Sequence, residues 1–134
     1  MVAVRYFSKT GNTRKVAKAI AKGAGAKAVS ITDEPKLKEY VDVLFLGGAP
    51  YANVMAPELK TYAFNLDPDK IGKVVLFTTS NWSRRTVLYL RKIFKAKGIE
   101  VEREYFYAHM LNVKNRLEDA KKFGRKIVER EFAD

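Results

Sequence analysis

A polar hexapeptide near the N-terminus has the composition of an anion-binding loop. It carries three hydroxyl side chains, one amide side chain, one lysine and one glycine between a strand-like run and a helix-like period. The unpaired N–H groups and the dipole of a helix N-terminus favour negative charge at such a place. A polar turn that merely caps the helix is the simpler alternative. Position and composition together favour phosphate binding by Ser8, Lys9, Thr10, Gly11, Asn12 and Thr13.

This loop does not match the two commonest phosphate-binding motifs. A Walker loop ends in Gly-Lys-Ser/Thr, and the dinucleotide-binding fingerprint has three glycines, whereas this loop has neither feature.

The amino-acid composition excludes several kinds of metal and redox site. The sequence has no cysteine, which excludes disulfides, thiolate zinc sites and Cys-ligated iron–sulfur clusters. The one histidine, His109, is too few for a multi-histidine metal site, and we interpret it as a surface residue.

The chain is strongly basic, with 26 Lys and Arg residues against 15 Asp and Glu residues and a net charge of +11. Residues 1–27 contain seven basic residues and no acidic one, and residues 84–97 contain six more without an acid. Such a field attracts nucleotides, nucleic acid, acidic protein faces or anionic lipid. The alternative is a solvated surface that only aids solubility.

The 134 residues fit a single domain over residues 1–134, because we find no repeat, low-complexity tract or linker. No apolar run approaches the roughly 20 residues that a membrane span needs, so no membrane association is expected. The N-terminus lacks the basic-then-apolar layout of a signal peptide. We therefore expect a cytoplasmic protein.

Apolar strand-like runs alternate with helical periods along the chain. Strands are predicted at 2–7, 28–31, 41–46, 74–77 and 99–107, with the third stopped by Gly47 and Gly48. Helices are predicted at 13–24, at 57–66, after a cap at Asn81 or Ser83, and from Asn115, where Glu118 would complete a capping box. Alternating glutamates in the fifth strand favour an edge position. The pattern predicts an α/β fold, a doubly wound parallel sheet of five strands in three layers.

Ligands of such sheets bind at the carboxyl ends of the strands, where the winding direction reverses. The loops after strands one, three and four should therefore lie together and carry the function. The first of these loops and its flanks resemble the signature of the flavodoxin family. The matching positions are Tyr6, Ser8, Gly11, Thr13, Ala17 and Ile20. Arg5 departs from that signature, and in a central strand it needs a carboxylate partner or a place near the rim.

The resemblance extends over essentially the whole chain. The segment from Leu46 to Asn53, followed by Pro57 to Lys60, is similar to the flavin-ring loop of short flavodoxin-like proteins, and Thr78 to Trp82 occupies the place of their second ring loop. The resemblance implies strand order 2-1-3-4-5 and noncovalent binding of FMN. It places the hexapeptide at the phosphate. It places one loop on each side of the isoalloxazine: Pro50, Tyr51, Ala52 and Asn53 on one, and Thr79, Ser80, Asn81 and Trp82 on the other.

Tyr51 and Trp82 are the expected stacking partners, because flat aromatic rings bury a large area against flavin. No catalytic side chain and no metal ligand is predicted, since the chemistry in such a site belongs to the cofactor. Flavodoxins are commonly acidic, so the basic residues Lys9, Arg84 and Arg85 depart from the family. We expect their field to raise the reduction potential of FMN.

Three functions fit these observations. The one we favour is an FMN electron carrier, a monomer or weak dimer, whose redox partner protein has an acidic face. The second is an FMN-dependent reductase that takes hydride from a nicotinamide and passes electrons to a quinone or similar acceptor. The third is a flavin-free module that binds an acidic partner or nucleic acid through its basic helices. Nucleic acid is disfavoured, because the sequence shows no RNP-like, KH-like or helix-turn-helix pattern.

Overall fold

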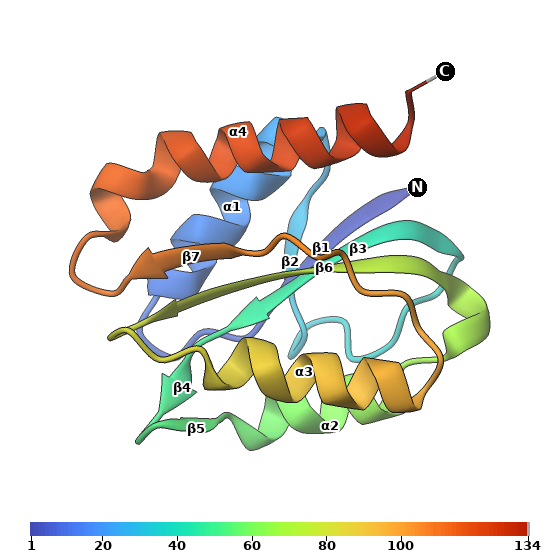
Figure 1. Cartoon of the computed structure of the whole chain (residues 1–134), viewed down its shortest axis with the longest axis horizontal. Coiled ribbons are helices and arrows are strands. Elements are labelled where there is room, and N and C mark those ends of the chain that lie inside the picture. The colour runs from blue at the N-terminus through green and yellow to red at the C-terminus, as the bar shows by residue number, and fades with distance from the viewer. Residues whose placement is uncertain (134) are drawn as a thin grey trace.

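Five parallel strands form the centre of the computed structural model, which describes residues 1–133 (Figure 1). Their order across the sheet is β2-β1-β3-β6-β7, and every neighbouring pair is parallel. The strands are β1 (Val2–Tyr6), β2 (Ala28–Ser30), β3 (Val41–Gly48), β6 (Ile71–Ser80) and β7 (Phe106–His109). The predicted α/β fold and the strand order 2-1-3-4-5 are confirmed.

Helices cover both faces of the sheet (Figure 1). One face carries α1 (Asn12–Ala24) and α4 (Val113–Glu131), and the other carries α2 (Pro57–Asn65) and α3 (Arg85–Ala96). Side chains of a strand alternate between the two faces. Phe45 and Phe77 therefore pack under α1 and α4, while Leu44, Leu46 and Leu76 pack under α2 and α3. Three short elements complete the fold: β4 (Pro50–Tyr51), β5 (Val54–Met55) and the 3-10 helix η1 (Pro68–Lys70).

Two central strands are longer than their sequence patterns predict. β3 continues through Gly47 and Gly48, so the prediction that the glycines stop it is wrong. Gly47 pairs with Tyr6 and Phe77, and a Cβ on Gly47 would lie 2.3 Å from the Phe77 ring. The glycine is needed there for close packing inside the sheet. β6 likewise extends beyond the predicted 74–77 at both ends.

The fifth strand begins later than predicted. Regular pairing covers only β7, and the stretch before it contributes a single bridge between Val74 and Val101. The N–H of Glu102 still donates to the carbonyl of Val74 at 2.8 Å, and the next N–H, that of Arg103, bonds a carboxylate oxygen of Glu102 at 2.6 Å. Between Val101 and Phe106 the chain therefore leaves the regular ladder.

The predicted helix caps are also wrong. Arg84 occupies the cap of α3 in place of Asn81 or Ser83, although the Ser83 hydroxyl still accepts the N–H of Arg85 at 3.2 Å. α4 begins at Val113 after Asn112, two residues before the predicted start. The Asn115 amide donates to Asn112 Oδ1, so the capping box with Glu118 does not form.

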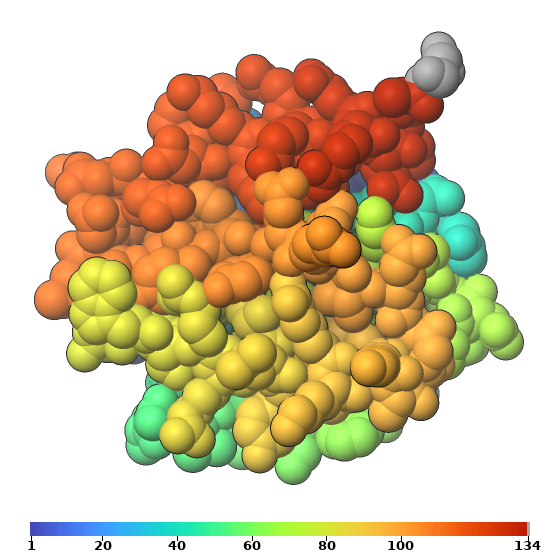
Figure 2. Space-filling model, viewed as in Figure 1, coloured from blue at the N-terminus to red at the C-terminus, as the bar shows by residue number. Residues whose placement is uncertain are grey.

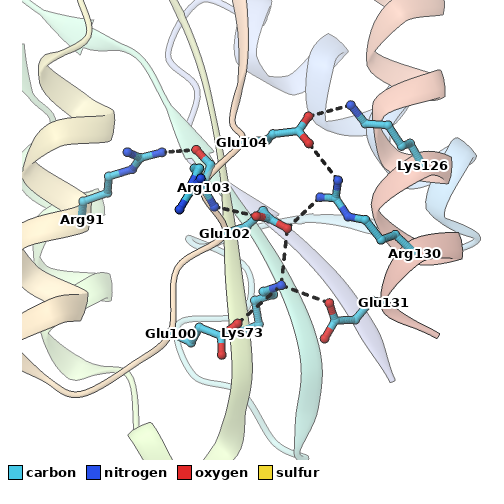
Figure 3. A network of polar contacts seen from close by, with 9 residues as sticks. All are labelled: Lys73, Arg91, Glu100, Glu102, Arg103, Glu104, Lys126, Arg130 and Glu131. Carbon is cyan, nitrogen blue, oxygen red and sulfur yellow. Dashed lines mark hydrogen bonds and ion pairs between the residues drawn. The ribbon is translucent and has the colours of Figure 1, made fainter. Parts of the chain in front are cut away.

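An ion-pair network ties the irregular stretch 100–105 to the C-terminal end of α4 (Figure 3). Lys73 Nζ of β6 lies 3.4 Å from carboxylate oxygens of both Glu100 and Glu102 and 3.1 Å from Glu131. Arg130 bridges Glu102 and Glu104, which also binds Lys126; these pairs measure 2.7, 2.8 and 2.6 Å. The network substitutes for the missing strand pairing at this edge of the sheet.

We expect this network to make stability depend on acid pH. Hydrogen bonds from Arg130 and Lys126 lower the pKa of Glu104 from its ordinary 4.5 to about 2. A group whose pKa is lower in the folded state stabilises the fold above its unfolded pKa, and that contribution is lost as pH falls through the folded value. Urea unfolding of Glu104→Gln should therefore show a smaller loss of stability between pH 4.5 and 2 than the parent protein. Glu118→Gln, at an exposed α4 residue without an ion pair in the described chain, is the matched control. Identical pH profiles for the parent and Glu104→Gln would contradict this assignment.

Candidate functional site

A cavity of about 550 Å³ opens at the carboxyl end of the sheet. In Figure 1 the arrowheads of β3, β6 and β7 all point toward this end, at the left of the view. The walls come from the loops after β1, β3 and β6, as the winding rule predicts, and from the loop after β7. The lining residues are Thr10, Asn12, Ala49, Pro50, Tyr51, Ala52, Asn53, Thr79, Ser80, Asn81, Ser83 and Met110.

The loop after β1 leaves the N-terminus of α1 open. The cap residue Gly11 has φ 94°, no side chain caps the helix, and its first turn has no acidic residue. The Ser8 hydroxyl accepts the N–H of Gly11 at 3.0 Å, which shapes the loop. Within residues 1–133, the N–H groups of Thr10, Asn12 and Thr13 have no acceptor. Unpaired amides and a helix dipole without an acid form an anion cradle.

Buried hydroxyls join this loop to the centre of the sheet. The side chains of Thr13 and Thr79 share a 2.7 Å hydrogen bond, and both residues are buried. Thr78 donates to the carbonyl of Gly48 at 2.7 Å. The Thr13 hydroxyl is therefore committed to Thr79, and it fixes the start of α1 against β6 rather than facing the cavity.

A two-residue turn connects β4 to β5 and forms one wall. Ala52 and Asn53 both have positive φ, 51° and 62°, as a two-residue hairpin turn requires. A left-handed backbone is costly for alanine, whose Cβ crowds the following carbonyl. The turn therefore stores strain beside the cavity, whose wall includes both residues.

Tyr51 links this wall to the anion cradle. Its hydroxyl accepts the N–H of Lys9 at 2.8 Å, and Lys9 Nζ lies 4.6 Å from the ring centroid. The Phe7 ring packs edge-on against Tyr51 at 6.4 Å. Burial raises the pKa of Tyr51, and the opposing hydrogen bond from Lys9 does not cancel that effect. The phenol is neutral at physiological pH and can donate a hydrogen bond as well as accept one.

Trp82 lies outside the cavity lining. Its backbone has φ 68°, its side chain is 73% exposed, and its ring packs against His109 with centroids 4.8 Å apart. His109 Nδ1 accepts the N–H of Leu111, which leaves Nε2 to bond Asn81 Oδ1 at 2.9 Å. The lone histidine thus orients a residue of the cavity wall from outside.

The structure brings most of the sequence-predicted site residues to one cavity. Nine of them line it, whereas Ser8, Lys9, Gly11 and Thr13 shape the loop behind it. Sequence reasoning missed Ala49, Ser83 and Met110. Met110 follows β7, whose carboxyl end lies at the same edge, so topology alone contained a signal for it. Arg5 points elsewhere and pairs with Glu34 at 2.8 Å.

Within residues 1–133, no group of three or more His, Cys, Asp and Glu side chains is placed to hold a metal ion. No helix in the described chain is long and apolar enough to cross a membrane.

The sequence matches no protein-family model and no curated protein. Its structure, however, is similar to solved flavodoxins. Flavodoxin 1 from Bacillus cereus superposes with a TM-score of 0.78 at 20% identity, covering 96% of this chain and 98% of the flavodoxin. A flavodoxin from the domain Archaea gives a TM-score of 0.74 at 18% identity, covering 97% of both chains. The chain has a flavodoxin-like fold.

The same flavodoxin-like fold occurs inside larger proteins. The Flv1 flavodiiron core from Synechocystis sp. PCC6803 superposes with a TM-score of 0.78 at 18% identity over 97% of this chain. This chain spans only 35% of that core. In this fold the winding direction reverses between β1 and β3, and the cavity lies at that switch point.

Proposed function

We propose that the chain binds FMN in this cavity and carries electrons between protein partners. The observation that carries the proposal is an uncapped, acid-free helix N-terminus opening beside a cavity of about 550 Å³. That volume is within the range of small-molecule sites. The helix N-terminus would bind the phosphate of FMN, and the adjoining cavity would hold its planar ring.

The residues present fit the phosphate of FMN. The free N–H groups of Thr10, Asn12 and Thr13 would hold it, with positive charge from Lys9 nearby. Ser8 holds the turn at Gly11 in shape. The hydroxyl of Thr10 and the amide of Asn12, which line the cavity, add hydrogen-bonding groups.

The residues also fit a flat ring system. Pro50, Tyr51, Ala52 and Asn53 would bound one side of it, and Thr79, Ser80 and Asn81 the other. FMN, when bound, supplies the exchange of electrons with a partner, so this chain's residues position the ring and exclude water. The strained peptides of Ala52 and Asn53 would bond its polar edge. Stacking by Trp82 stays a prediction from sequence.

A redox experiment separates the carrier from the reductase. The FMN-loaded protein should be reduced by dithionite and reoxidised by ferricyanide, whereas NADH or NADPH alone should leave the visible spectrum unchanged. Rapid bleaching by either nicotinamide would instead support the reductase.

The +11 charge favours a partner with an acidic face. We also expect the chain to act as a monomer or weak dimer in the cytoplasm.

Removing positive charge beside the site should lower the reduction potential of bound FMN. A unit charge about 7 Å from a redox centre, at an effective dielectric near 20, contributes roughly 2 kcal/mol, or ~100 mV for one electron before screening. The double variant Arg84→Gln, Arg85→Gln should therefore lower the potential by tens of millivolts in spectroelectrochemical titration. The control Lys22→Gln, Lys27→Gln removes the same charge from the last turn of α1 and the segment just after it. Equal shifts in both double variants would contradict a local effect.

A further inference from the structure

Trp82 combines an unfavourable backbone with an exposed indole. A bulky residue at φ 68° is a conformational outlier, and folding normally buries tryptophan rather than leaving it 73% exposed. Tyr107 holds this arrangement in place. Its hydroxyl accepts the N–H of Trp82 at 2.8 Å and donates to the carbonyl of Ser80 at 3.1 Å. Strain maintained by surrounding contacts points to function.

The same tyrosine also positions a guanidinium. The Arg84 guanidinium carbon lies 3.9 Å from the Tyr107 ring centroid and 5.7 Å from that of Tyr105. Arg84 is exposed and makes no ion pair within residues 1–133. Its N–H groups are thus held in a fixed place with no carboxylate to bind, and Arg85 follows with its charge likewise unpaired there.

Exposed apolar side chains lie in the loop after β7, which follows His109. Leu111 is 87% exposed and Met110 43%, and the hydrogen bond from Leu111 N–H to His109 joins them to the ring packed on Trp82. In Figure 2 the yellow segment before α3 and the orange end of β7 lie side by side at the left of the molecule. We call this surface the Trp82 corner; it consists of Trp82, Arg84, Arg85, Met110 and Leu111.

We propose that the Trp82 corner is the docking surface for an acidic protein partner. Carboxylates of the partner pair with Arg84 and Arg85, and an apolar side chain between them packs on the Trp82 indole. Charge complementarity supports this occupant, because residues 81–98 contain no acidic side chain. Tryptophan, arginine and methionine are enriched in protein interfaces, and fixed side chains lose little entropy on binding. Because Met110 also lines the cavity, docking is measured on the FMN-free protein, apart from FMN binding.

A single-stranded nucleic acid fits the corner less well. Such ligands stack successive bases on free aromatic faces. Here Arg84 lies over the Tyr107 ring, Arg91 lies 5.4 Å from the Tyr105 centroid, and the Trp82 ring itself packs against Tyr107 and His109. The geometry therefore favours carboxylates on the guanidinium groups over a stacked strand.

Trp82 is the only tryptophan, so its emission reports on the corner directly. We would titrate the FMN-free protein, at low ionic strength, with a short synthetic peptide that alternates glutamate and leucine. Its glutamine counterpart is the neutral control peptide. We expect a saturable change in Trp82 emission with the acidic peptide alone. Binding should weaken at least about tenfold in Arg84→Gln, Arg85→Gln, and much less in the charge-matched Lys22→Gln, Lys27→Gln.

Other outcomes would overturn the proposal. One is an acidic peptide that leaves the emission unchanged; another is equal binding loss in both double variants. A third is an oligothymidine that binds the corner more tightly than the peptide, which would make it a nucleic-acid surface. FMN affinity, followed separately through flavin fluorescence, distinguishes failure here from failure of the proposed function.

Discussion

Replacing Asn12 with aspartate is expected to weaken FMN binding about 100-fold while slightly stabilising the fold. Asn12 is the first residue of α1 and lines the cavity. A carboxylate there would face the phosphate, and two like charges about 5 Å apart at an effective dielectric near 20 repel by roughly 3 kcal/mol. The same carboxylate complements the helix dipole, which is worth about 0.3–1 kcal/mol. Fluorescence titration and urea unfolding measure the two effects.

Two controls make this prediction specific. Riboflavin lacks the phosphate, so its affinity should change little in Asn12→Asp. Asn115→Asp places the same substitution in the first turn of α4, outside the cavity lining. It removes the amide that donates to Asn112 Oδ1, so it serves as a control for FMN binding only, and the FMN affinity should not change. If Asn12→Asp weakened riboflavin and FMN equally, the anion cradle would not be the phosphate site.

Gly23→Ala is expected to destabilise the protein by about 3 kcal/mol. A Cβ on Gly23 would lie 1.8 Å from the carbonyl oxygen of Lys121, and one on Gly124 would lie 2.3 Å from that of Ile20. These contacts are with backbone, so α1 and α4 must move apart, and overpacking of this kind typically costs 1–3 kcal/mol or somewhat more. α1 carries the anion cradle, so FMN affinity should fall as well.

Helix propensity alone predicts that Gly23→Ala would stabilise the protein. Alanine is favoured over glycine inside a helix by about 1 kcal/mol. Lys22→Ala, at the neighbouring exposed position, should change the free energy of unfolding by less than about 0.5 kcal/mol. Urea unfolding that showed Gly23→Ala to be as stable as the parent would mean that the two helices are not packed this closely.

The strands and the site loops follow from patterns within short stretches of sequence, whereas the strand order follows from the resemblance to flavodoxins. The runs around Phe45 and Phe77 have the apolar character of buried strands, and the helices carry clear apolar periods. Because loops after parallel strands meet at one edge, the positions of Thr10, Tyr51 and Asn81 around one cavity were predictable once the strands were assigned.

The differences arise where contacts between distant residues decide the local structure. The stretch 100–105 has a strand-like pattern, but it pairs with β6 through a single bridge, and its carboxylates form ion pairs with Lys73, Arg130 and Lys126. From the sequence alone, Gly47 indicates the end of a strand. The structure shows that a glycine is needed inside β3 because the Phe77 ring lies against it. The outward orientation of Trp82 depends on the Tyr107 hydroxyl, 25 residues away.

The hairpin turn between β4 and β5 could not be predicted from sequence, for a different reason. Two-residue hairpin turns favour Asn-Gly or Asp-Gly, because both central residues need positive φ. Here Ala52 and Asn53 occupy them, and only Asn53 carries a weak signal. A strained turn beside a ligand cavity is where local sequence preference and structure are expected to disagree.

The most direct test of the account is the visible absorption spectrum of the protein after incubation with FMN and gel filtration. The account predicts an oxidised flavin band that elutes with the protein at close to one FMN per chain and is largely lost in Asn12→Asp. A protein that elutes colourless at high FMN concentration would contradict it. The loops would then keep the flavodoxin-like arrangement without its cofactor.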